Sequence, residues 1–266
     1  GVVYLADRLG KPVLIEGPAG TGKTQLAKSV AEMTGARLIR LQCYEGLDEA
    51  KALYEWNYQR RLLHIKLDER SEKTLEEKES SIFSETFLLK RPLLQALMHP
   101  KPPVLLIDEL DRSDEEFESF LLEILSEWQI TIPEIGTIRA SEPPYVILTS
   151  NRTRELSDAV RLRCFYLSLY YPEFEKELAI VIAKIPGIDE RLGQQICLFM
   201  EMIREEKLEK VPGVAETLDW AHALAALHQD HLDPEMIEAT LGIVFKDKDD
   251  VEFVKPVSYT HLTLPT

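Results

Sequence analysis

The segment "GPAGTGKT", residues 17–24, has the residue types and spacing of a phosphate-binding loop. A glycine, four further residues, and then Gly22, Lys23 and Thr24 match the pattern G-x-x-x-x-G-K-[ST]. Glycines allow backbone N–H groups to converge on an anion, and the N-terminus of a following helix adds its positive dipole. Lys23 can reach the β- and γ-phosphates, and the Thr24 hydroxyl can coordinate Mg²⁺. The residues expected to bind the nucleotide are Gly17, Pro18, Ala19, Gly20, Thr21, Gly22, Lys23, Thr24 and Gln25.

The context of this loop decides between two explanations. A glycine-rich turn between a strand and a helix is the simpler alternative. However, the apolar run "KPVLIE" precedes the loop, and Leu26, Val30 and Met33 recur at helical spacing until Gly35. A strand, a loop and a helix in this order favour the phosphate-binding interpretation.

Two carboxylates follow a second apolar run, "PVLLIDELDR" at residues 103–112. Residues 104–107 show no polar alternation, so they are predicted to form a strand buried on both faces. Ligands of α/β proteins gather at the carboxyl ends of the strands, where the phosphate-binding loop would also lie. We expect Asp108 to hold Mg²⁺ together with Thr24, and Glu109 to polarise the water that attacks the nucleotide.

The acidic residues further along are explained by the next helix. Ser113 and Glu116 have the spacing of a capping box at the start of a helix. Its apolar stripe, predicted to pack in the core, consists of Phe117, Phe120, Leu121, Ile124, Leu125 and Trp128. Capping acids follow a turn, whereas Asp108 and Glu109 directly follow four aliphatic residues. The catalytic interpretation of that pair is therefore preferred over capping.

A third predicted strand, "YVILTSN" at residues 145–151, ends in small polar residues. Asn151 can hydrogen-bond both the γ-phosphate and the attacking water. In isolation it would be assigned to a turn, but beside the other two motifs a sensing role is favoured. Catalysis is thus predicted to involve Lys23, Glu109 and Asn151.

Strand-like and helical patterns alternate in the first two thirds of the chain, which is typical of a parallel sheet covered by helices. The strand-like runs are 12–16, 37–41, 103–107, 145–149 and 164–169. After Pro172 only helical patterns follow, marked by Leu178, Ile182 and Ile185; Leu192, Ile196, Phe199 and Ile203; Leu218, Ala221 and Leu224; and Ile237 and Leu241. The predicted fold class is α/β: a P-loop core with a five-stranded parallel sheet sandwiched by helices, followed by a small all-α lid domain.

The predicted domain limits are residues 1–172 for the nucleotide-binding core, 173–250 for the helical lid and 251–266 for a tail. Residues from about 256 onward, which include the final stretch "VSYTHLTLPT", fit no helical or strand period. They resemble translated adapter sequence and are left out of the fold prediction.

The composition argues against several classes of protein. Of the 266 residues, 46 are Asp or Glu and 31 are Lys or Arg, and the net charge of −15 opposes binding to nucleic acid. No apolar run reaches about 18 residues, so no membrane span is expected. Cys43, Cys164 and Cys197 lie far apart, which fits a reducing compartment and favours a cytoplasmic location. His228 and His231 are expected at the surface rather than on a metal.

Two further segments have open roles. The charged stretch "DERSEKTLEEKESS", residues 68–81, is predicted to be an exposed connector. The stretch "QITIPEIGTIRA", residues 129–140, has the alternation of a hairpin. Its isoleucines could pack against the core or contact a client protein, and the sequence leaves both alternatives open.

The three motifs "GPAGTGKT", "VLLIDELDR" and "ILTSN", in this order, resemble those of AAA+ ATPases, and specifically of the MoxR family. The resemblance covers about residues 1 to 250. Longer segments are similar to those of CoxD-type proteins, a subgroup found beside carbon monoxide dehydrogenase: "QCYEGLDEAKALYEWNYQRRLL", "FLLKRPLLQAL", "TIPEIGTIRA", "TSNRTREL" and "PGVAETLDWAHAL". The resemblance implies ATP as the nucleotide, a homo-oligomeric ring of six subunits with nucleotide between neighbours, a partner protein with a von Willebrand factor A domain, and a chaperone role in metalloenzyme maturation.

The same resemblance suggests an arginine finger, a residue that one subunit inserts into the site of the next. Within "RLRCF", Arg163 is the first candidate and Arg161 the second. One departure from the AAA+ pattern concerns the lid, because Glu216 and Thr217 stand where many relatives carry a sensor arginine. The sequence therefore supports an ATP-hydrolysing remodelling chaperone, with a nucleotide-gated assembly scaffold of little turnover as the alternative. A small-molecule kinase is disfavoured because the helical region is acidic.

Overall fold

The computed structural model describes residues 1–68, 74, 84–133 and 135–261 of the chain. The chain divides into two compact units, and each is described by itself. One unit comprises Gly1–Gly17 and Lys23–Ser168, and the other comprises Pro18–Gly22 and the residues from Leu169 onward. The predicted charged connector, residues 68–81, lies outside the described residues except for Asp68 and Thr74.

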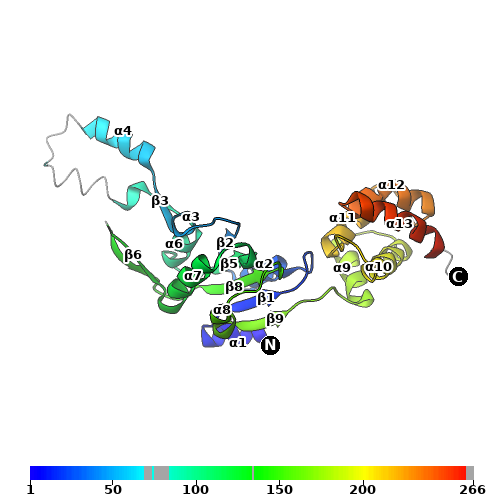
Figure 1. The fold of residues 1–266 in the computed structure, drawn as a ribbon, viewed down its shortest axis with the longest axis horizontal. Coiled ribbons are helices and arrows are strands. Elements are labelled where there is room, and N and C mark those ends of the chain that lie inside the picture. The colour runs from blue at the N-terminus through cyan, green and yellow to red at the C-terminus, as the bar shows by residue number, and fades with distance from the viewer. Residues whose placement is uncertain (69–73, 75–83, 134, 262–266) are drawn as a thin grey trace. The chain divides into compact units, whose positions relative to one another are not determined.

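A five-stranded sheet forms the centre of the first unit, with helices beside it (Figure 1). Its strands, in spatial order, are β2 (Leu38–Gln42), β5 (Val104–Asp108), β8 (Tyr145–Ser150), β1 (Val13–Glu16) and β9 (Phe165–Ser168). Every neighbouring pair is parallel. All five residues of β5 are buried, as the unbroken apolar run predicts. The predicted α/β class with five parallel strands is confirmed.

The first unit also contains helices, several of which pack against the sheet. They are α1 (Val2–Leu9), α2 (Lys23–Thr34), α3 (Glu49–Leu53), α4 (Tyr58–Asp68), α6 (Pro92–Leu97), α7 (Glu115–Glu127) and α8 (Asp158–Arg163). Helix α2 contacts β2, β5 and β8 and buries Ala27, Val30 and Ala31. Helix α2 begins at Lys23, directly after the glycine-rich loop. The packing of α2 against the sheet therefore fixes the position of the Lys23 backbone.

Helix α7 begins one residue later than the predicted capping box requires. The carboxylate of Asp114 accepts a hydrogen bond from the Phe117 N–H at 2.8 Å, so Asp114 is the cap. Ser113 instead donates its hydroxyl proton to the Leu110 carbonyl at 2.7 Å, which closes the short 3₁₀ turn Leu110–Arg112. The prediction of Ser113 and Glu116 as a capping box is therefore wrong.

The apolar stripe of α7 packs as predicted. Phe117, Leu121, Ile124 and Leu125 are buried in the main core cluster, and Phe120 and Trp128 pack against it while partly exposed. The same cluster contains Leu105 and Ile107 of β5. The helix after the acidic motif therefore supports the strand that carries the motif.

The predicted hairpin at residues 129–140 is present as strands β6 (Gln129–Ile132) and β7 (Gly136–Arg139), which pair antiparallel. Ile132 is fully buried beside Trp56 and Phe87. Partly buried Ile130, Ile135 and Ile138 pack against the same cluster. This cluster also contains Trp56 and Leu88 of a second antiparallel pair, β3 (Tyr54–Trp56) and β4 (Leu88–Lys90). The isoleucines thus pack within the chain, which is one of the two predicted alternatives.

The second unit is built from helices. They are α9 (Phe174–Lys184), α10 (Glu190–Arg204), α11 (Val214–Ala226), α12 (Pro234–Val244) and α13 (Lys248–His261). Most predicted core positions are buried: Leu192, Ile196, Phe199, Ile203, Ala221, Leu224, Ile237 and Leu241. Ile182 is 45% exposed, and Val181 lies in the core instead. None of the helices in the described ranges is both long enough and apolar enough to cross a membrane.

A buried ion pair explains why Val181, and not the predicted Ile182, faces the core from α9. Glu177 is 1% exposed and accepts hydrogen bonds from the Arg204 guanidinium at 2.7 Å and from the Thr217 hydroxyl at 2.6 Å. Because Glu177 turns inward, Val181, one turn later on the same face, is buried, whereas Ile182 faces outward.

The packing of the helical unit continues beyond residue 250, where the predicted lid ends. Val254 on α13 is fully buried in the same cluster as Trp220 and Leu241. The segment predicted as a tail from residue 251 therefore begins as part of a packed helix, because its apolar residue covers the core. The domain limits stay a proposal, and this contact argues for moving the second limit toward the C-terminus.

Candidate nucleotide-binding site

The glycine-rich loop has the backbone shape that its residues predict. Gly20 and Gly22 have φ values of +76° and +91°, a region that L side chains rarely adopt. The Thr21 hydroxyl donates to the Pro18 carbonyl at 2.9 Å and so closes a turn. Glycine is required at position 20 for a second reason, because an added Cβ would lie 2.7 Å from the Gly213 Cα.

Lys23 follows the loop at the start of α2. It is 6% exposed, and its Nζ donates to the Gly17 carbonyl at 2.7 Å. Burial lowers the pKa of the ammonium group, while the carboxylates of Asp111, Asp108 and Glu109 act in the opposite direction. Lys23 is therefore a buried cation held close to the predicted acidic cluster.

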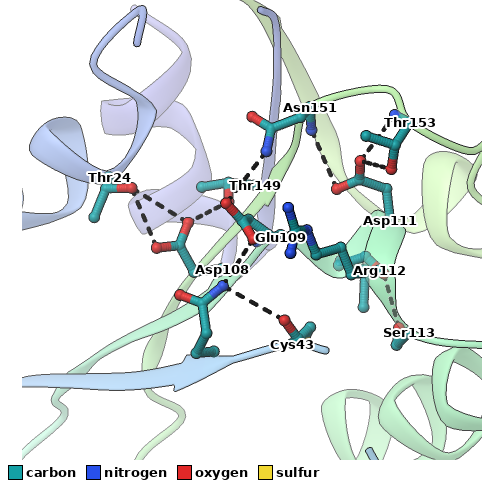
Figure 2. A network of polar contacts seen from close by, with 12 residues as sticks. Thr24, Cys43, Asp108, Glu109, Asp111, Arg112, Ser113, Thr149, Asn151 and Thr153 are labelled. Atoms are coloured by element: carbon teal, nitrogen blue, oxygen red, sulfur yellow. Dashed lines mark hydrogen bonds and ion pairs between the residues drawn. The ribbon is translucent and has the colours of Figure 1, made fainter. Parts of the chain in front are cut away.

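Asp108, the last residue of β5, lies between the hydroxyl groups of Thr24 and Thr149 (Figure 2). It is 3% exposed. The Thr24 hydroxyl lies 3.2 and 3.3 Å from its two oxygens, and the Thr149 hydroxyl donates to Oδ1. The Arg40 guanidinium pairs with Oδ2 at 2.7 Å.

The pair of Thr24 and Asp108 fits a Mg²⁺ ion. Hydroxyl and carboxylate oxygens are the hard ligands that Mg²⁺ prefers, and the ion is usually held by one or two such groups together with substrate phosphates and water. Among the residues that the structure describes, no group of three or more His, Cys, Asp and Glu side chains could hold a metal on its own. A site that shares the metal with a nucleotide is consistent with both observations.

Glu109 has a backbone conformation that is unusual for a residue with a side chain. Its φ and ψ are 56° and 49°, in the left-handed region. The Glu109 N–H donates to the Thr149 hydroxyl at 2.9 Å, which holds this turn. The carboxylate accepts from Gln42 at 3.0 Å and pairs with Arg112 at 3.0 Å, and its side chain remains 31% exposed. Strain of this kind is often found at functional sites.

Asn151 lies just beyond β8 and faces Glu109 (Figure 2). Its side-chain amide donates to Glu109 Oε1 at 3.4 Å, and its backbone N–H donates to Asp111 Oδ1 at 3.1 Å. The fold thus brings Thr24, Asp108, Glu109 and Asn151 to one edge of the sheet, from motifs that are far apart in the sequence.

Four further polar residues of this cluster escaped the sequence analysis: Arg40, Gln42, Asp111 and Thr149. Gln42 lies directly opposite Asp108 in the parallel register of β2 and β5. Arg40 precedes Gln42 by two positions and therefore points to the same face. Knowledge of the strand order would have identified both, but spacing along the chain does not give strand order. Asp111 lay in the acidic run itself and could have been considered with Glu109.

Asp111 is expected to stabilise the segment that carries Asn151. It is 3% exposed and accepts from the Thr153 N–H at 2.9 Å and the Thr153 hydroxyl at 2.6 Å, in addition to Asn151. Asp111→Ala leaves these donors without their acceptor, so we expect the free energy of unfolding to fall by about 2–3 kcal/mol. Urea denaturation measures this change. Thr153→Ala, which removes one donor, should cost about 1 kcal/mol, and an equal loss in both variants would contradict the role of Asp111.

The two candidate finger arginines make contacts within their own chain. Arg163 donates to the Leu122 carbonyl at 3.3 Å and to the Ser126 hydroxyl at 3.1 Å on α7. Arg161 pairs with Glu16 at 3.6 Å. Both residues are exposed, Arg161 with 41% of its side chain. The finger role of either residue stays a prediction.

The residues at the start of α11, where the AAA+ pattern predicts a sensor arginine, interact with their near neighbours. The Glu216 carboxylate accepts from the Gly213 N–H at 2.9 Å, and the buried Thr217 hydroxyl donates to Glu177. The Val214 N–H donates to the Gly20 carbonyl at 3.1 Å. A cavity of about 470 Å³ lies beside these residues and is also lined by Tyr171 and Lys246. Glu216 and Thr217 thus shape the helix start rather than supply a cation.

The cysteines are not suited to nucleophilic chemistry at neutral pH. Cys43, Cys164 and Cys197 are free thiols, and burial raises the pKa of each to about 12. Cys43 lies next to the site, where its backbone N–H donates to the Asp108 carbonyl at 2.8 Å. Since only the thiolate is a strong nucleophile, Cys43 serves here as a packing residue.

Comparison with known proteins identifies the family. Residues 13–171 match the family described as "ATPase family associated with various cellular activities (AAA)". This match covers more than half of the chain, so the protein belongs to the AAA ATPase family. The family and the P-loop architecture define it as an ATP hydrolase.

Three individual proteins that resemble this chain share at most about a quarter of its residues. A curated protein of Staphylococcus epidermidis, itself uncharacterized, is 24% identical over 203 residues, which is 74% of this chain and 70% of that protein. A point variant of Thermotoga maritima RuvB is similar in structure with a TM-score of 0.52 and 17% identity, over 91% of this chain and 66% of the RuvB chain. The structure described as the Thermotoga maritima RuvB Holliday junction branch migration motor gives a TM-score of 0.51 at 17% identity, over 100% of this chain and 75% of that chain. At these identities the likeness concerns the fold.

Proposed function

We propose that the protein is a MoxR-type AAA+ ATPase that hydrolyses ATP with Mg²⁺ to remodel or mature partner proteins. One observation supports ATP hydrolysis in particular. Thr24 and Asp108 contact each other, Glu109 and Asn151 contact each other, and both pairs lie at one edge of the sheet. One pair fits a metal, and the other can orient a water molecule.

Each residue of the site has a distinct proposed role. Bound ATP would supply the transferable phosphoryl group, whose charge is spread over its three equatorial oxygens in the transition state. Lys23 and the N–H groups of residues 17–25 bind the phosphates, and Thr24 and Asp108 hold Mg²⁺. Glu109 orients the attacking water and accepts its proton. Asn151 positions the water and the terminal phosphate, and Arg163 of a neighbouring subunit neutralises charge.

The finer assignment rests on the resemblance of the longer segments to CoxD-type MoxR proteins. It proposes a cytoplasmic homo-oligomeric ring of six subunits, a partner with a von Willebrand factor A domain and a metalloenzyme client. RuvB is described as a motor for branch migration at Holliday junctions. For this chain a net charge of −15 weighs against a nucleic-acid partner. Neighbouring open reading frames that encode an A-domain protein or a molybdenum hydroxylase subunit would support the proposed partners.

A nucleotide-gated assembly scaffold with little turnover is the second candidate. The observation that favours it is the start of α11, where Glu216 and Thr217 are engaged locally and no arginine stands. A lid without such a cation has one fewer group that distinguishes ATP from ADP.

Light scattering of the purified chain with and without Mg²⁺-ATP, together with phosphate release, separates the two candidates. We expect ATP to increase the particle mass and phosphate to be released steadily, because nucleotide between neighbours completes each site. EDTA should stop the release. Assembly without phosphate release would favour the scaffold, and neither assembly nor release would overturn both proposals.

A further inference from the structure

A further buried carboxylate, besides Asp108 and Asp111, lies beside the site but takes no part in the proposed chemistry. Glu16 is the last residue of β1 and directly precedes the phosphate-binding loop. It lies opposite Ser150 of β8 and Ser168 of β9 in the register of the sheet. Its exposed fraction is 2%. A buried charge is costly unless it is paired, so the partners of Glu16 indicate what it does.

The partners of Glu16 come from three later parts of the chain. Arg152 Nε donates to Glu16 Oε2 at 3.2 Å, and the Tyr166 hydroxyl donates to the same oxygen at 3.0 Å. Arg161 approaches Oε1 at 3.6 Å. Arg152 also donates to the Tyr166 hydroxyl and to the Ser168 hydroxyl. Glu16 thus accepts hydrogen bonds from the β8 end and from β9, and it forms a longer ion pair with α8.

Arg152 is the partner that connects this cluster to the nucleotide site. It immediately follows Asn151, and its backbone is left-handed with φ of 62°, which is unfavourable for a residue with a side chain. The Arg152 N–H donates to the Ser150 hydroxyl at 3.0 Å. This turn directs the Arg152 side chain back to Glu16. The pairing with Glu16 therefore helps to hold the backbone on which Asn151 stands.

We propose that Glu16 is a positioning residue: its carboxylate holds Arg152 in the left-handed turn and thereby places Asn151 for hydrolysis. This inference rests on the proposed role of Asn151. Glu16 makes no contact with Thr24, Asp108 or Glu109 that would give it a part in metal binding or proton transfer. Its effect should appear in the rate of hydrolysis rather than in nucleotide affinity, because misplacement of a sensing group by about 1 Å can cost about 100-fold in rate.

The Glu16 carboxylate also indicates a role for Arg161. Since Arg161 pairs with Glu16 of its own chain, it serves as part of the positioning cluster, and Arg163 is left as the candidate for the neighbouring site. The two arginines of "RLRCF" therefore have different roles in this proposal.

Glu16→Gln tests the proposal, because it keeps the shape of the side chain and removes its charge. We expect kcat to fall about 10- to 100-fold while the dissociation constant for a fluorescent ATP analogue stays within about threefold, which is the signature of an interaction needed in the transition state. Arg152→Gln should give the same change, and Arg152→Lys should restore part of the rate. The double variant should be no slower than either single variant, since the two groups act as one unit.

Hydrogen exchange provides a readout that needs no nucleotide. In the nucleotide-free chain, a peptide spanning residues 149–156 should exchange faster in Glu16→Gln and Arg152→Gln than in the unaltered protein. Arg139→Gln, which removes an exposed arginine on β7, is the matched control and should change neither exchange nor kcat.

Several results would overturn the proposal. These are unchanged kcat and exchange in both variants, or a loss that appears only as weaker nucleotide binding, which would assign Glu16 to the phosphate-binding loop. If Glu16→Gln does not fold, Arg152→Gln decides, because its side chain is 47% exposed. An unaltered protein that binds ATP without turnover would refute the proposed hydrolysis, while the exchange experiment would still judge the positioning role.

Discussion

Glu109→Gln is expected to abolish most ATP turnover while nucleotide binding persists. The carboxylate is directed into the site by a left-handed turn and is held by Gln42 and Arg112, so it is placed to accept a proton from water. An amide of the same shape cannot accept that proton, and general-base catalysis contributes about 100- to 10,000-fold. Steady-state phosphate release gives kcat, and titration with a fluorescent ATP analogue gives the dissociation constant.

Glu116→Gln serves as the control, because this acidic residue lies exposed in the first turn of α7. Its kcat should equal that of the unaltered protein. If Glu109→Gln turned over ATP at the original rate, Glu109 would have no part in the mechanism, whereas loss of binding would place it among the nucleotide-binding residues.

Arg163→Ala is expected to have an effect of similar size. An arginine that neutralises charge on the transferring phosphoryl group contributes about 10³- to 10⁵-fold in rate. Arg163 is exposed, and within the part of the chain that the structure describes it donates to the Leu122 carbonyl and the Ser126 hydroxyl, so it can leave these neutral partners for a phosphate. Phosphate release by the purified variant measures the loss.

A mixing experiment shows whether Arg163 acts on the site of a neighbour. Lys23→Ala chains lack a functional phosphate-binding lysine but keep Arg163, and Arg163→Ala chains have the reverse. If the arginine acts between subunits, mixing the two inactive variants should restore part of the activity. Arg161→Ala, assigned to the cluster around Glu16, should gain nothing from the same mixing, and the opposite pattern would exchange the roles of the two arginines.

The parts of the fold that were predictable depend on local patterns. Residues 104–107 are aliphatic throughout, and only a strand covered on both faces accommodates such a run, so β5 could be placed from sequence. Fixed spacing around Lys23 identified the phosphate-binding loop, because backbone N–H convergence needs glycine at defined positions. Asp108 and Asn151 followed from their place at strand ends.

The parts that were missed depend on which strands become neighbours. Arg40 and Gln42 belong to the site because β2 pairs with β5 in a register that sets Gln42 opposite Asp108. Nothing in the spacing along the chain specifies that register. A similar limit applies to Ser113, which could cap a helix or close a turn, and the 3₁₀ turn before α7 decides for the turn.

The left-handed backbone at Glu109 means that the residue best for stability at this position differs from the residue needed for activity. Glycine is the residue best suited to this torsion, and it would relieve a conformational cost of about 1 kcal/mol, yet it has no group that can take up a proton. A search for thermally robust variants would therefore favour substitutions at residue 109 that silence the enzyme. Any engineering of this chain for durability should hold that residue fixed and seek its gains elsewhere.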